Sequence, residues 1–460
     1  MPSAPVMETL KLSELMASLS HSLDITEGQP EGHCVRCCWI GMRIGQQLDL
    51  DDATLWSLFY TLLLKDLGCS SNAARVCELY LTDDISFKRD FKTVPDSLPQ
   101  VLRFVLSHTG LGAPLRDRFR TLLTVVRHSD AIAHDLISTR CQRGAEIASL
   151  LRFPASVSEG IFSLDEHFDG KGRPQKLAGF AIPLASRIAL LAQVIDVFHT
   201  VSGPEAALKE VRLRSGRWFD PDLVDAFEAL VAAEPEAFWS TLSSPGLQDE
   251  VLRLEPASHT VALDDDYLDD IATAFGQVVD SKSPYTSGHS QRVAHYADRI
   301  AEVLGLAPER RRWLKRAALL HDVGKLGVSN SVLDKPGKLD GNEWQAVQAH
   351  AQYTEAILSR ISAFAEMARV SAAHHERLDG QGYPRGLSAD AIAIETRIIT
   401  TADIFDAITA ERPYRGAVPI AETLTMMAEL VGSAIDPACF EALKTAVGRP
   451  QNSREAVDVP

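Results

Sequence analysis

The amino-acid sequence predicts an all-α protein made of two helical domains in tandem. Segments such as 13–23 and 267–279 place apolar residues at i, i+3, i+4 and i+7, which is the stripe of an amphipathic helix. No sustained period-two alternation or paired hairpin signal appears, which argues against a sheet. The chain also repeats itself, and a repeat of this length predicts two copies of one domain.

The internal repeat relates the first half of the chain to the second. Three segments align in the same order: 31–50 with 287–306, 63–68 with 319–324, and 165–174 with 375–384. The first copy is longer because of an insertion between about Cys69 and Arg140. Both copies close on a similar phrase, FDPDLVDAFEAL and IDPACFEALKTA.

The domain boundaries follow from this repeat and from breaks in the helical pattern. SSPG and EPASHT interrupt the pattern, so we expect a linker at 236–263 between domains at 1–235 and 264–460. Within the second copy, an apolar stripe ends at Gly305 and Pro308 opens the next segment, which predicts a helix end and a restart.

Composition limits the classes of partner. A net charge of −16 argues against binding long nucleic acid, because such binding needs clustered Lys and Arg. No run approaches the roughly 20 apolar residues that span a bilayer, and the N-terminus lacks the pattern of a secretory signal. We therefore expect a cytoplasmic protein without a membrane partner.

The cysteines predict reduced thiols rather than a disulfide framework. Six of the seven lie in the first third of a chain without an export signal. Cys34, Cys37 and Cys38 stand close to His33, but no second ligand pair follows at zinc-finger spacing. Buried helix thiols are the favoured interpretation.

The second copy collects side chains that ligate metals. Five histidines and two aspartates are the candidates: His289, His321, Asp322, His350, His374, His375 and Asp403. Imidazole and carboxylate donors together suit iron, manganese or zinc. A single buried histidine is usually a core residue, but seven such groups, several adjacent or at helix starts, favour a metal site.

The pair His321-Asp322 suggests a dinuclear centre. The pair follows an apolar run, where a buried carboxylate needs cationic partners. Asp322 can bridge two ions through its two oxygens, and two ions roughly 3.5–4 Å apart can share a hydroxide and clamp a phosphoryl group. Lys325 lies three residues further and could neutralise phosphate charge, although a solvated lysine is an equal alternative from position alone.

A loop and a basic segment are candidates for substrate binding. Gly380, Gly382 and Pro384 predict a tight loop after His374-His375. We expect Gly382 and Tyr383 of this loop to contact substrate, with the Tyr383 ring facing a purine. Arg412 and Arg415 could each grip a phosphate or a guanine edge.

These motifs resemble the HD-GYP family, a branch of the HD phosphohydrolases. The resemblance rests on YTSGHSQRVAHYA, LLHDVGKLGV, LDKPGKL, HHERLDGQGYPRGL, RIITTADIFDAIT and RPYR, and it covers about 280–415. It implies HD-type helical bundles, two divalent metal ions (iron, with manganese as an alternative), and hydrolysis of cyclic di-GMP to pGpG, GMP or both. Thr354 departs from the family, which usually has Gly there, and we expect it to affect helix packing more than chemistry.

What the resemblance implies for single residues follows from the same motifs. Lys325 would contact the scissile phosphate, and Tyr383, Arg412 and Arg415 the nucleotide. All seven metal-ligand candidates match ligands of the family. Position 285 carries Tyr where some relatives have a Glu that holds a third ion, so we expect two ions and accumulation of pGpG ahead of GMP.

The first copy has lost most of this set. It keeps His33 and Asp66, and the other ligand positions carry Lys65, Arg140, Leu164, Asp165 and Gln193. Cys69 stands at the position of Lys325. We interpret residues 1–235 as a degenerate HD-GYP-like domain with a structural, regulatory or dimerising role.

Two alternatives to cyclic di-GMP hydrolysis remain open on the sequence. One is hydrolysis of 3′,3′-cyclic GMP-AMP, because the motifs define the chemistry better than the bases. The other is a non-catalytic scaffold that binds proteins such as diguanylate cyclases. The complete ligand set argues against the scaffold, and a homodimer is a further candidate assembly.

Overall fold

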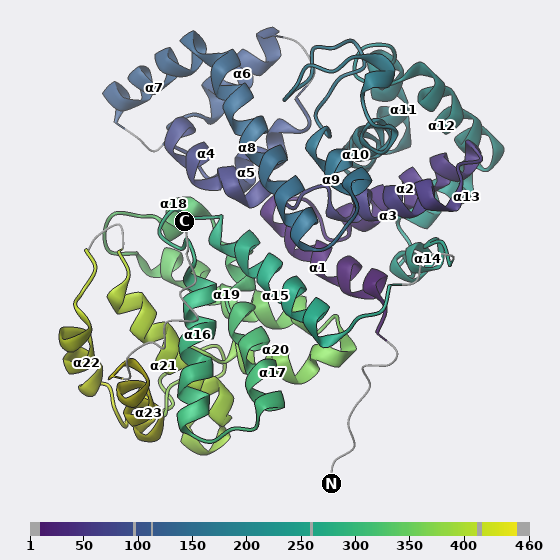
Figure 1. Cartoon of the computed structure of the whole chain (residues 1–460). Helices are drawn as coiled ribbons and strands as arrows, with labels where there is room; N and C mark the ends of the chain where they lie inside the picture. Colours follow the sequence, from purple (N-terminus) through teal and green to yellow (C-terminus); the bar gives the residue numbers. More distant parts are fainter. Residues whose placement is uncertain (1–9, 95–97, 112–113, 258–260, 412–415, 449–460) are drawn as a thin grey trace. The chain divides into compact units, whose positions relative to one another are not determined.

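The computed structural model describes residues 10–94, 98–111, 114–257, 261–411 and 416–448, which form helices and no strand (Figure 1). The predicted all-α class is therefore confirmed. The chain divides into two compact units, Met1–Leu263 and Asp264–Pro460, which we call unit 1 and unit 2.

Unit 1 is built around three apolar helices that contact one another, α2, α3 and α10. Their burial follows from sequences such as FYTLLL in α3, where almost every side chain is apolar. The helices of unit 1 are α1 (Leu12–Thr26), α2 (His33–Gln47), α3 (Asp52–Leu64), η2 (Cys69–Asn72), α4 (Ala73–Tyr80), α5 (Asp84–Phe91), α6 (Leu98–His108), α7 (Leu115–Arg127), α8 (Ser129–Leu150), α9 (Ala155–Phe162), η3 (Gly179–Ala181), α10 (Leu184–Ser202), α11 (Pro204–Arg214), α12 (Pro221–Ala233), α13 (Pro235–Leu242) and α14 (Leu247–Arg253).

Unit 2 is organised around α16, which contacts α15, α17, α21 and α23. The helices of unit 2 are α15 (Asp265–Asp280), α16 (His289–Val303), α17 (Pro308–Leu319), η4 (Val323–Gly327), α18 (Asn330–Leu333), α19 (Gly341–Leu358), η5 (Ser362–Phe364), α20 (Ala365–Ala372), η6 (Ala389–Ala391), α21 (Ile394–Thr409), α22 (Ile420–Ala428) and α23 (Pro437–Gly448). The predicted helix end before Gly305 and restart at Pro308 are confirmed.

The same local device opens α2 and α16. Gly32 and Gly288 are the N-caps, and both have positive φ, of 82° and 66°. Only glycine adopts this conformation at little cost, which explains the glycine before the histidine in both copies. Asp24 and Asp280 then accept hydrogen bonds from backbone N–H groups of the following helix start.

The predicted linker at 236–263 differs from the structure. Half of it is helical, as α13 and α14, and the segment belongs to unit 1. Phe238, Leu242, Leu247 and Val251 are buried there, and the Phe238 ring lies 4.9 Å from that of Trp39. The Ser, Pro and Gly residues at 243–246 form a turn between two helices rather than a domain boundary, because apolar side chains on both sides still reach the core.

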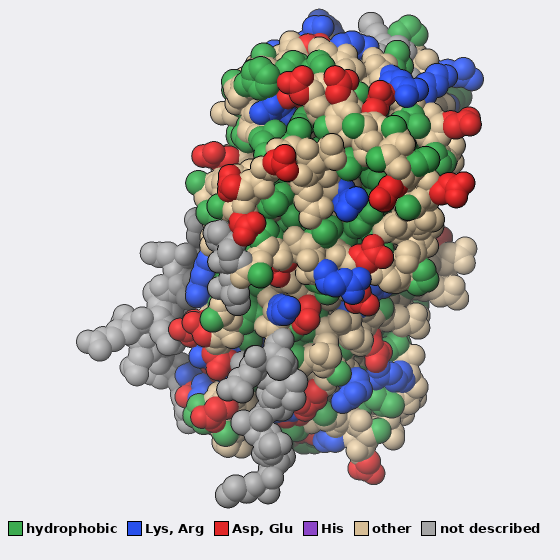
Figure 2. Space-filling view, turned by 90° about the vertical axis from the view of Figure 1, so that its right-hand side faces the viewer, with side chains coloured by type: hydrophobic (Ala, Val, Ile, Leu, Met, Phe, Trp, Pro, Cys, Tyr) green, Lys and Arg blue, Asp and Glu red, His purple; other side chains and the backbone are tan. Residues whose placement is uncertain are grey.

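Helix α10 is the described helix that is long and apolar enough to cross a membrane, which the sequence did not lead us to expect. Most of it is buried within unit 1, as in the core helix of a globular domain. On the face shown in Figure 2, acidic and basic side chains are interspersed. The described cysteines are all free thiols, and all but Cys77 are buried.

Candidate metal centre

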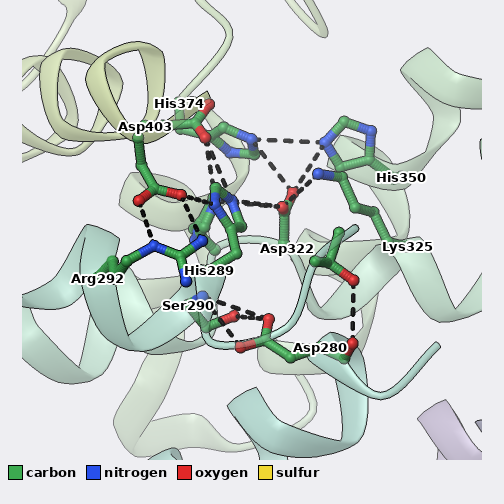
Figure 3. Close-up of polar contacts among 12 residues, drawn as sticks. Asp280, His289, Ser290, Arg292, Asp322, Lys325, His350, His374 and Asp403 are labelled. Carbon is green, nitrogen blue, oxygen red and sulfur yellow. Dashed lines mark hydrogen bonds and ion pairs between the residues drawn. The ribbon is translucent and has the colours of Figure 1, made fainter. Parts of the chain in front are cut away.

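Five separate helical segments of unit 2 bring the predicted ligands together (Figure 3). His289 is the first residue of α16, His321 and Asp322 follow the end of α17, and His350 lies on α19. His374 and His375 follow α20, and Asp403 lies on α21. Five of the seven lie at the start of a helix or just after the end of one, which brings polar groups close to one another without opening the apolar core.

Asp322 lies between two pairs of histidines. Its Oδ2 is 3.5 Å from Nε2 of His289 and 3.3 Å from Nε2 of His321. Its Oδ1 is 3.5 Å from Nε2 of His350 and 3.6 Å from Nε2 of His374. Each oxygen of Asp322 thus faces its own pair of histidine nitrogens, which is the arrangement of a carboxylate that bridges two ions.

Asp403 and His375 extend the two groups of donors. Oδ1 of Asp403 is 3.3 Å from Nε2 of His289, on the side of the first pair. His375 has a donor atom within 4.8 Å of those of His350 and His374, on the side of the second pair. All seven predicted ligands therefore converge in the structure.

The orientation of three histidines is fixed from behind the site. His321 and His374 each donate from Nδ1 to the backbone carbonyl three residues earlier, at 2.7 and 2.6 Å, and His350 does the same to Val347. A proton held on Nδ1 leaves Nε2 with its lone pair facing the centre. Such outer hydrogen bonds are typical of metal-ligating histidines.

The fourth histidine is fixed by two residues that the sequence analysis did not identify. Nδ1 of His289 donates to Asp406 Oδ2 at 2.7 Å, and Nε of Arg292 donates to Asp406 Oδ1 at 2.6 Å. Asp406 was not assigned a role from the sequence. The sequence signal that could have identified Asp406 is the matching aspartate in the first copy, Asp196.

The pKa values of the site follow from burial and from the carboxylates. Burial lowers the pKa of His350, of His374 and, to about 3, of His375, so these rings are neutral and able to ligate a cation. Burial opposes protonation of His289, but its neighbours Asp322, Asp403 and Asp406 raise its pKa well above the usual range.

The donor set fits divalent cations. Nε2 of His321 and Oδ1 of Asp322 are buried and have no hydrogen-bond partner among the described residues. Buried polar atoms without partners are costly, and cations between them would satisfy both. Neutral imidazoles with carboxylates are ligands of iron, manganese and zinc.

The predicted loop after His375 is present, and its residues pack against one another and against the centre. A Cβ on Gly382 would lie 2.4 Å from the backbone nitrogen of Arg377, so Gly382 allows close packing of the loop. The Tyr383 ring packs on the His375 ring at 4.7 Å and is only partly exposed. Both observations give the loop a supporting role beside the centre, and substrate contact by these residues stays a prediction.

Glu376 holds the loop in place. Its two carboxylate oxygens accept hydrogen bonds from the backbone N–H groups of Arg385 and Leu387, at 2.7 and 2.8 Å. Glu166 has the same role in unit 1, where it accepts from Gln175 and Leu177. The loop is thus a feature of the fold in both units.

Lys325 connects the centre to a cavity. Its Nζ forms an ion pair with Asp322, and its side chain is partly exposed to a cavity of about 550 Å³. His289, Asp322, Tyr285, Lys338 and Trp344 also line this cavity. Its volume is in the range of small-molecule sites. Arg412 and Arg415 lie outside the described residues.

Thr354 stabilises the approach of α19 to the His321-Asp322 turn. Its hydroxyl donates to the carbonyl of His321 and accepts from the N–H of Gly324, both at 3.0 Å. A Cβ on Gly324 would lie 1.9 Å from the carbonyl oxygen of His350, so the helix and the turn are in close contact. This arrangement agrees with an effect of Thr354 on packing.

Unit 1 repeats the framework of this site without its ligands. His33 and Arg36 both bind Asp196 at 2.6 Å, as His289 and Arg292 bind Asp406. Arg140, at the position of His350, forms an ion pair with Asp165, at the position of His375. One salt bridge thus occupies the place of the second group of donors.

A lysine occupies the place of the first group. Nζ of Lys65 lies 3.0 Å from Nε2 of His33 and 3.0 Å from Oε1 of Gln193, and it forms an ion pair with Asp66. The Lys65 side chain is fully buried. Burial opposes its charge, but the Asp66 carboxylate raises the pKa of Lys65 well above the usual value. Its ammonium group contacts the residues that correspond to three metal ligands of unit 2.

Comparison with known proteins places these observations in a family. A model of the HD domain matches residues 126–223 and 274–439. The 3′3′-cGAMP-specific phosphodiesterase 3 of Vibrio cholerae is 57% identical over 439 residues, which cover 95% of each chain. The 3′3′-cGAMP-specific phosphodiesterase 1 of that organism is 34% identical over 342 residues, 70% of this chain and 75% of the relative.

A solved structure is similar over the same extent. The crystal structure of a cyclic GMP-AMP specific phosphodiesterase of V. cholerae aligns with a TM-score of 0.65 and 52% sequence identity. The alignment covers 96% of this chain and 98% of the other.

Proposed function

This chain belongs to the HD-GYP family of HD-domain proteins, and from that premise we propose that unit 2 hydrolyses 3′3′-cyclic GMP-AMP. Membership of this family supports the general description of the chain as a metal-dependent phosphodiesterase that acts on cyclic dinucleotides. The choice of base rests on the two relatives, which are both named as specific for 3′3′-cGAMP. They favour the second of our sequence hypotheses over cyclic di-GMP.

The geometry that carries the catalytic proposal is the position of Asp322. Its two oxygens face two groups of histidines, and one oxygen lacks any hydrogen-bond partner in the described part of the chain. His289, His321 and Asp403 would hold one ion, and His350, His374 and His375 the other, with Asp322 shared. Such ions supply a nucleophile at neutral pH and stabilise charge on the phosphate.

The protein's own groups orient the reaction. Hydrogen bonds from Nδ1 to backbone carbonyls keep the histidine rings in fixed directions. Lys325 lies beside Asp322 and borders the cavity, where its ammonium group can stabilise negative charge on the scissile phosphate. Lys338 and Trp344 line the same cavity and are available to the second phosphate and a base.

We assign no catalysis to unit 1. Lys65 and the Arg140–Asp165 pair place positive charge where a metal site would need free donors. Unit 1 keeps the fold but lacks most of the candidate metal ligands, as expected of a degenerate domain with a structural or regulatory role. The proposal does not depend on the metal being iron rather than manganese.

The proposed function is tested on the full chain reconstituted anaerobically with Fe(II) or with Mn(II). We expect two ions per chain, and a kcat/KM for 3′3′-cyclic GMP-AMP at least about tenfold above that for cyclic di-GMP, a difference of about 1.4 kcal/mol. The linear dinucleotide should appear before mononucleotides. Equal or preferred hydrolysis of cyclic di-GMP would reject the base assignment, and two bound ions without hydrolysis of either substrate would favour a scaffold.

A further inference from the structure

Helix α7 lies at the edge of unit 1 (Figure 1). It exposes a stripe of apolar side chains. Leu115, Phe119, Leu123 and Val126 are 82, 70, 58 and 50% exposed. The other apolar side of the helix is covered, because Val125 is buried in a small core. α7 therefore has two apolar sides, and the described residues cover one of them.

A row of arginines borders the exposed stripe. Successive residues are about 100° apart around the helix axis, so the four exposed apolar residues fall within an arc of about 80°. Arg116, Arg120 and Arg127 all lie on one side of this arc, within about 60° of its edge. All three arginines are exposed, and no ion pair of theirs occurs among the described residues. Arg118 differs, since it points inward and donates to the carbonyls of Thr109 and Leu106 at 3.1 and 3.0 Å.

We propose that this face of α7 binds the surface of a bilayer that contains anionic phospholipids. Leucine and phenylalanine side chains can enter the boundary between headgroups and acyl chains, while arginines reach the lipid phosphates. The whole chain has a net charge of −16. This face of α7 is nevertheless complementary in charge to anionic headgroups, because three arginines lie beside the stripe. Our expectation of no membrane partner rested on the absence of a spanning run, and surface binding needs no such run.

A second copy of this chain is a poorer occupant of the same face. In an antiparallel two-fold pair the arginine row of each α7 would lie beside the arginine row of its partner. Like charges brought together in this way oppose association. The other flank of the stripe is covered by the core of unit 1. In a parallel pair of α7 helices, the arginine row of one helix would have to lie beside this flank of its partner, which is not free.

The proposed surface is independent of the metal centre. α7 lies in the insertion of the first copy, between the segments that match the second copy. Variants on its outer face should therefore leave dinucleotide hydrolysis in solution unchanged. This separates failure of the membrane proposal from failure of the proposed catalytic function.

The test is flotation of the full chain with vesicles of phosphatidylcholine, with and without phosphatidylglycerol. We expect binding only to the anionic vesicles, weakened by salt. Phe119→Ser/Leu123→Ser should reduce binding at least about tenfold, and Arg116→Gln/Arg120→Gln by a similar factor, as about 1 kcal/mol per basic residue implies. Leu213→Ser is the matched control, since Leu213 of α11 is 59% exposed and lies outside the stripe.

Three results would overturn the proposal. The wild-type chain could fail to float with anionic vesicles, or the Phe119→Ser/Leu123→Ser variant could float as well as the control. Light scattering could also show a dimer that this variant dissociates without any vesicle binding, which would assign the face to a second copy. An unchanged circular dichroism spectrum and unchanged hydrolysis would show that each variant is folded.

Discussion

Replacing Lys65 with Met is expected to destabilise unit 1 strongly and to leave catalysis per folded molecule unchanged. The substitution keeps the apolar stem of the side chain and removes its ammonium group. That group is the partner of the buried carboxylate of Asp66, and it also lies 3.0 Å from His33 and from Gln193. None of these three residues belongs to the proposed catalytic unit.

The expected loss of stability follows from the burial of the ion pair. The Lys65 and Asp66 side chains are 0 and 1% exposed. Removing one partner of such a pair costs about 3–5 kcal/mol, because the remaining charge is left buried and unpaired. Removing both charges, in Lys65→Met/Asp66→Leu, should recover most of this loss, since apolar residues of similar volume can replace a buried pair at little cost.

The measurement is urea unfolding followed by tryptophan fluorescence. Four of the six tryptophans, Trp39, Trp56, Trp218 and Trp239, are in unit 1, so the signal reports mainly on that unit. Lys325→Met is the matched control, because it removes the lysine that pairs with Asp322 in unit 2. It should lower turnover and leave the unit 1 transition in place. A loss below about 1 kcal/mol for Lys65→Met, or no recovery in the double variant, would refute the role of Lys65 as a substitute for a metal ion.

Three further predictions concern the two units. Asp322→Asn should lose bound metal and turnover, measured by metal analysis and product formation, whereas Asp66→Asn should leave turnover per folded molecule nearly intact. Arg412→Ala and Arg415→Ala should each raise KM with metal content unchanged, and loss of metal instead would give these arginines a structural role. Burial raises the pKa of Asp24 from 3.8 to about 6, so the folded state holds an extra proton between these values and the wild-type protein loses stability as pH rises from 4 to 6. Asp24→Asn lacks this loss, so its unfolding free energy relative to wild type should rise by about 2 kcal/mol between pH 4 and 7 in urea titrations; a constant difference would contradict the shift.

The fold class and the ligand set could be predicted because both depend on local patterns. Helical stripes and their ends are properties of short segments, as at Gly305 and Pro308. The convergence of His289 with Asp403 could be expected from motif resemblance, although they are far apart in the chain. Helices α13 and α14 within 236–263 were missed, because apolar residues such as Phe238 and Val251 stabilise them only through the core that they reach.

The supporting residues were harder to predict than the ligands. Asp406 resembles any acidic residue on a helix until the structure places it 2.7 Å from His289. The exposed side of α7 was equally hidden, because the sequence of an amphipathic helix does not say which of two apolar sides is covered. Long-range packing determines both features, and neither has a local signature.

The two copies together separate what the fold requires from what the chemistry requires. Both keep the glycine that opens the central helix, the carboxylate that binds its first histidine, and the glutamate that holds the loop, as in Gly288, Asp406 and Glu376. These residues are not specific to the candidate metal centre, because unit 1 has them too. The residues that differ are those facing the centre, where His321 becomes Lys65.

Charge explains why a lysine could replace a histidine at that position. The carboxylate of Asp66 is buried, and such a charge is costly in a protein interior unless a cation lies beside it. A neutral side chain at position 65 would leave this cost in place, whereas the ammonium group of Lys65 forms an ion pair with Asp66 and offsets it. Lys65 therefore stabilises the domain and also occupies the place of a metal ion, so metal binding in unit 1 would require removing a cation before adding a ligand.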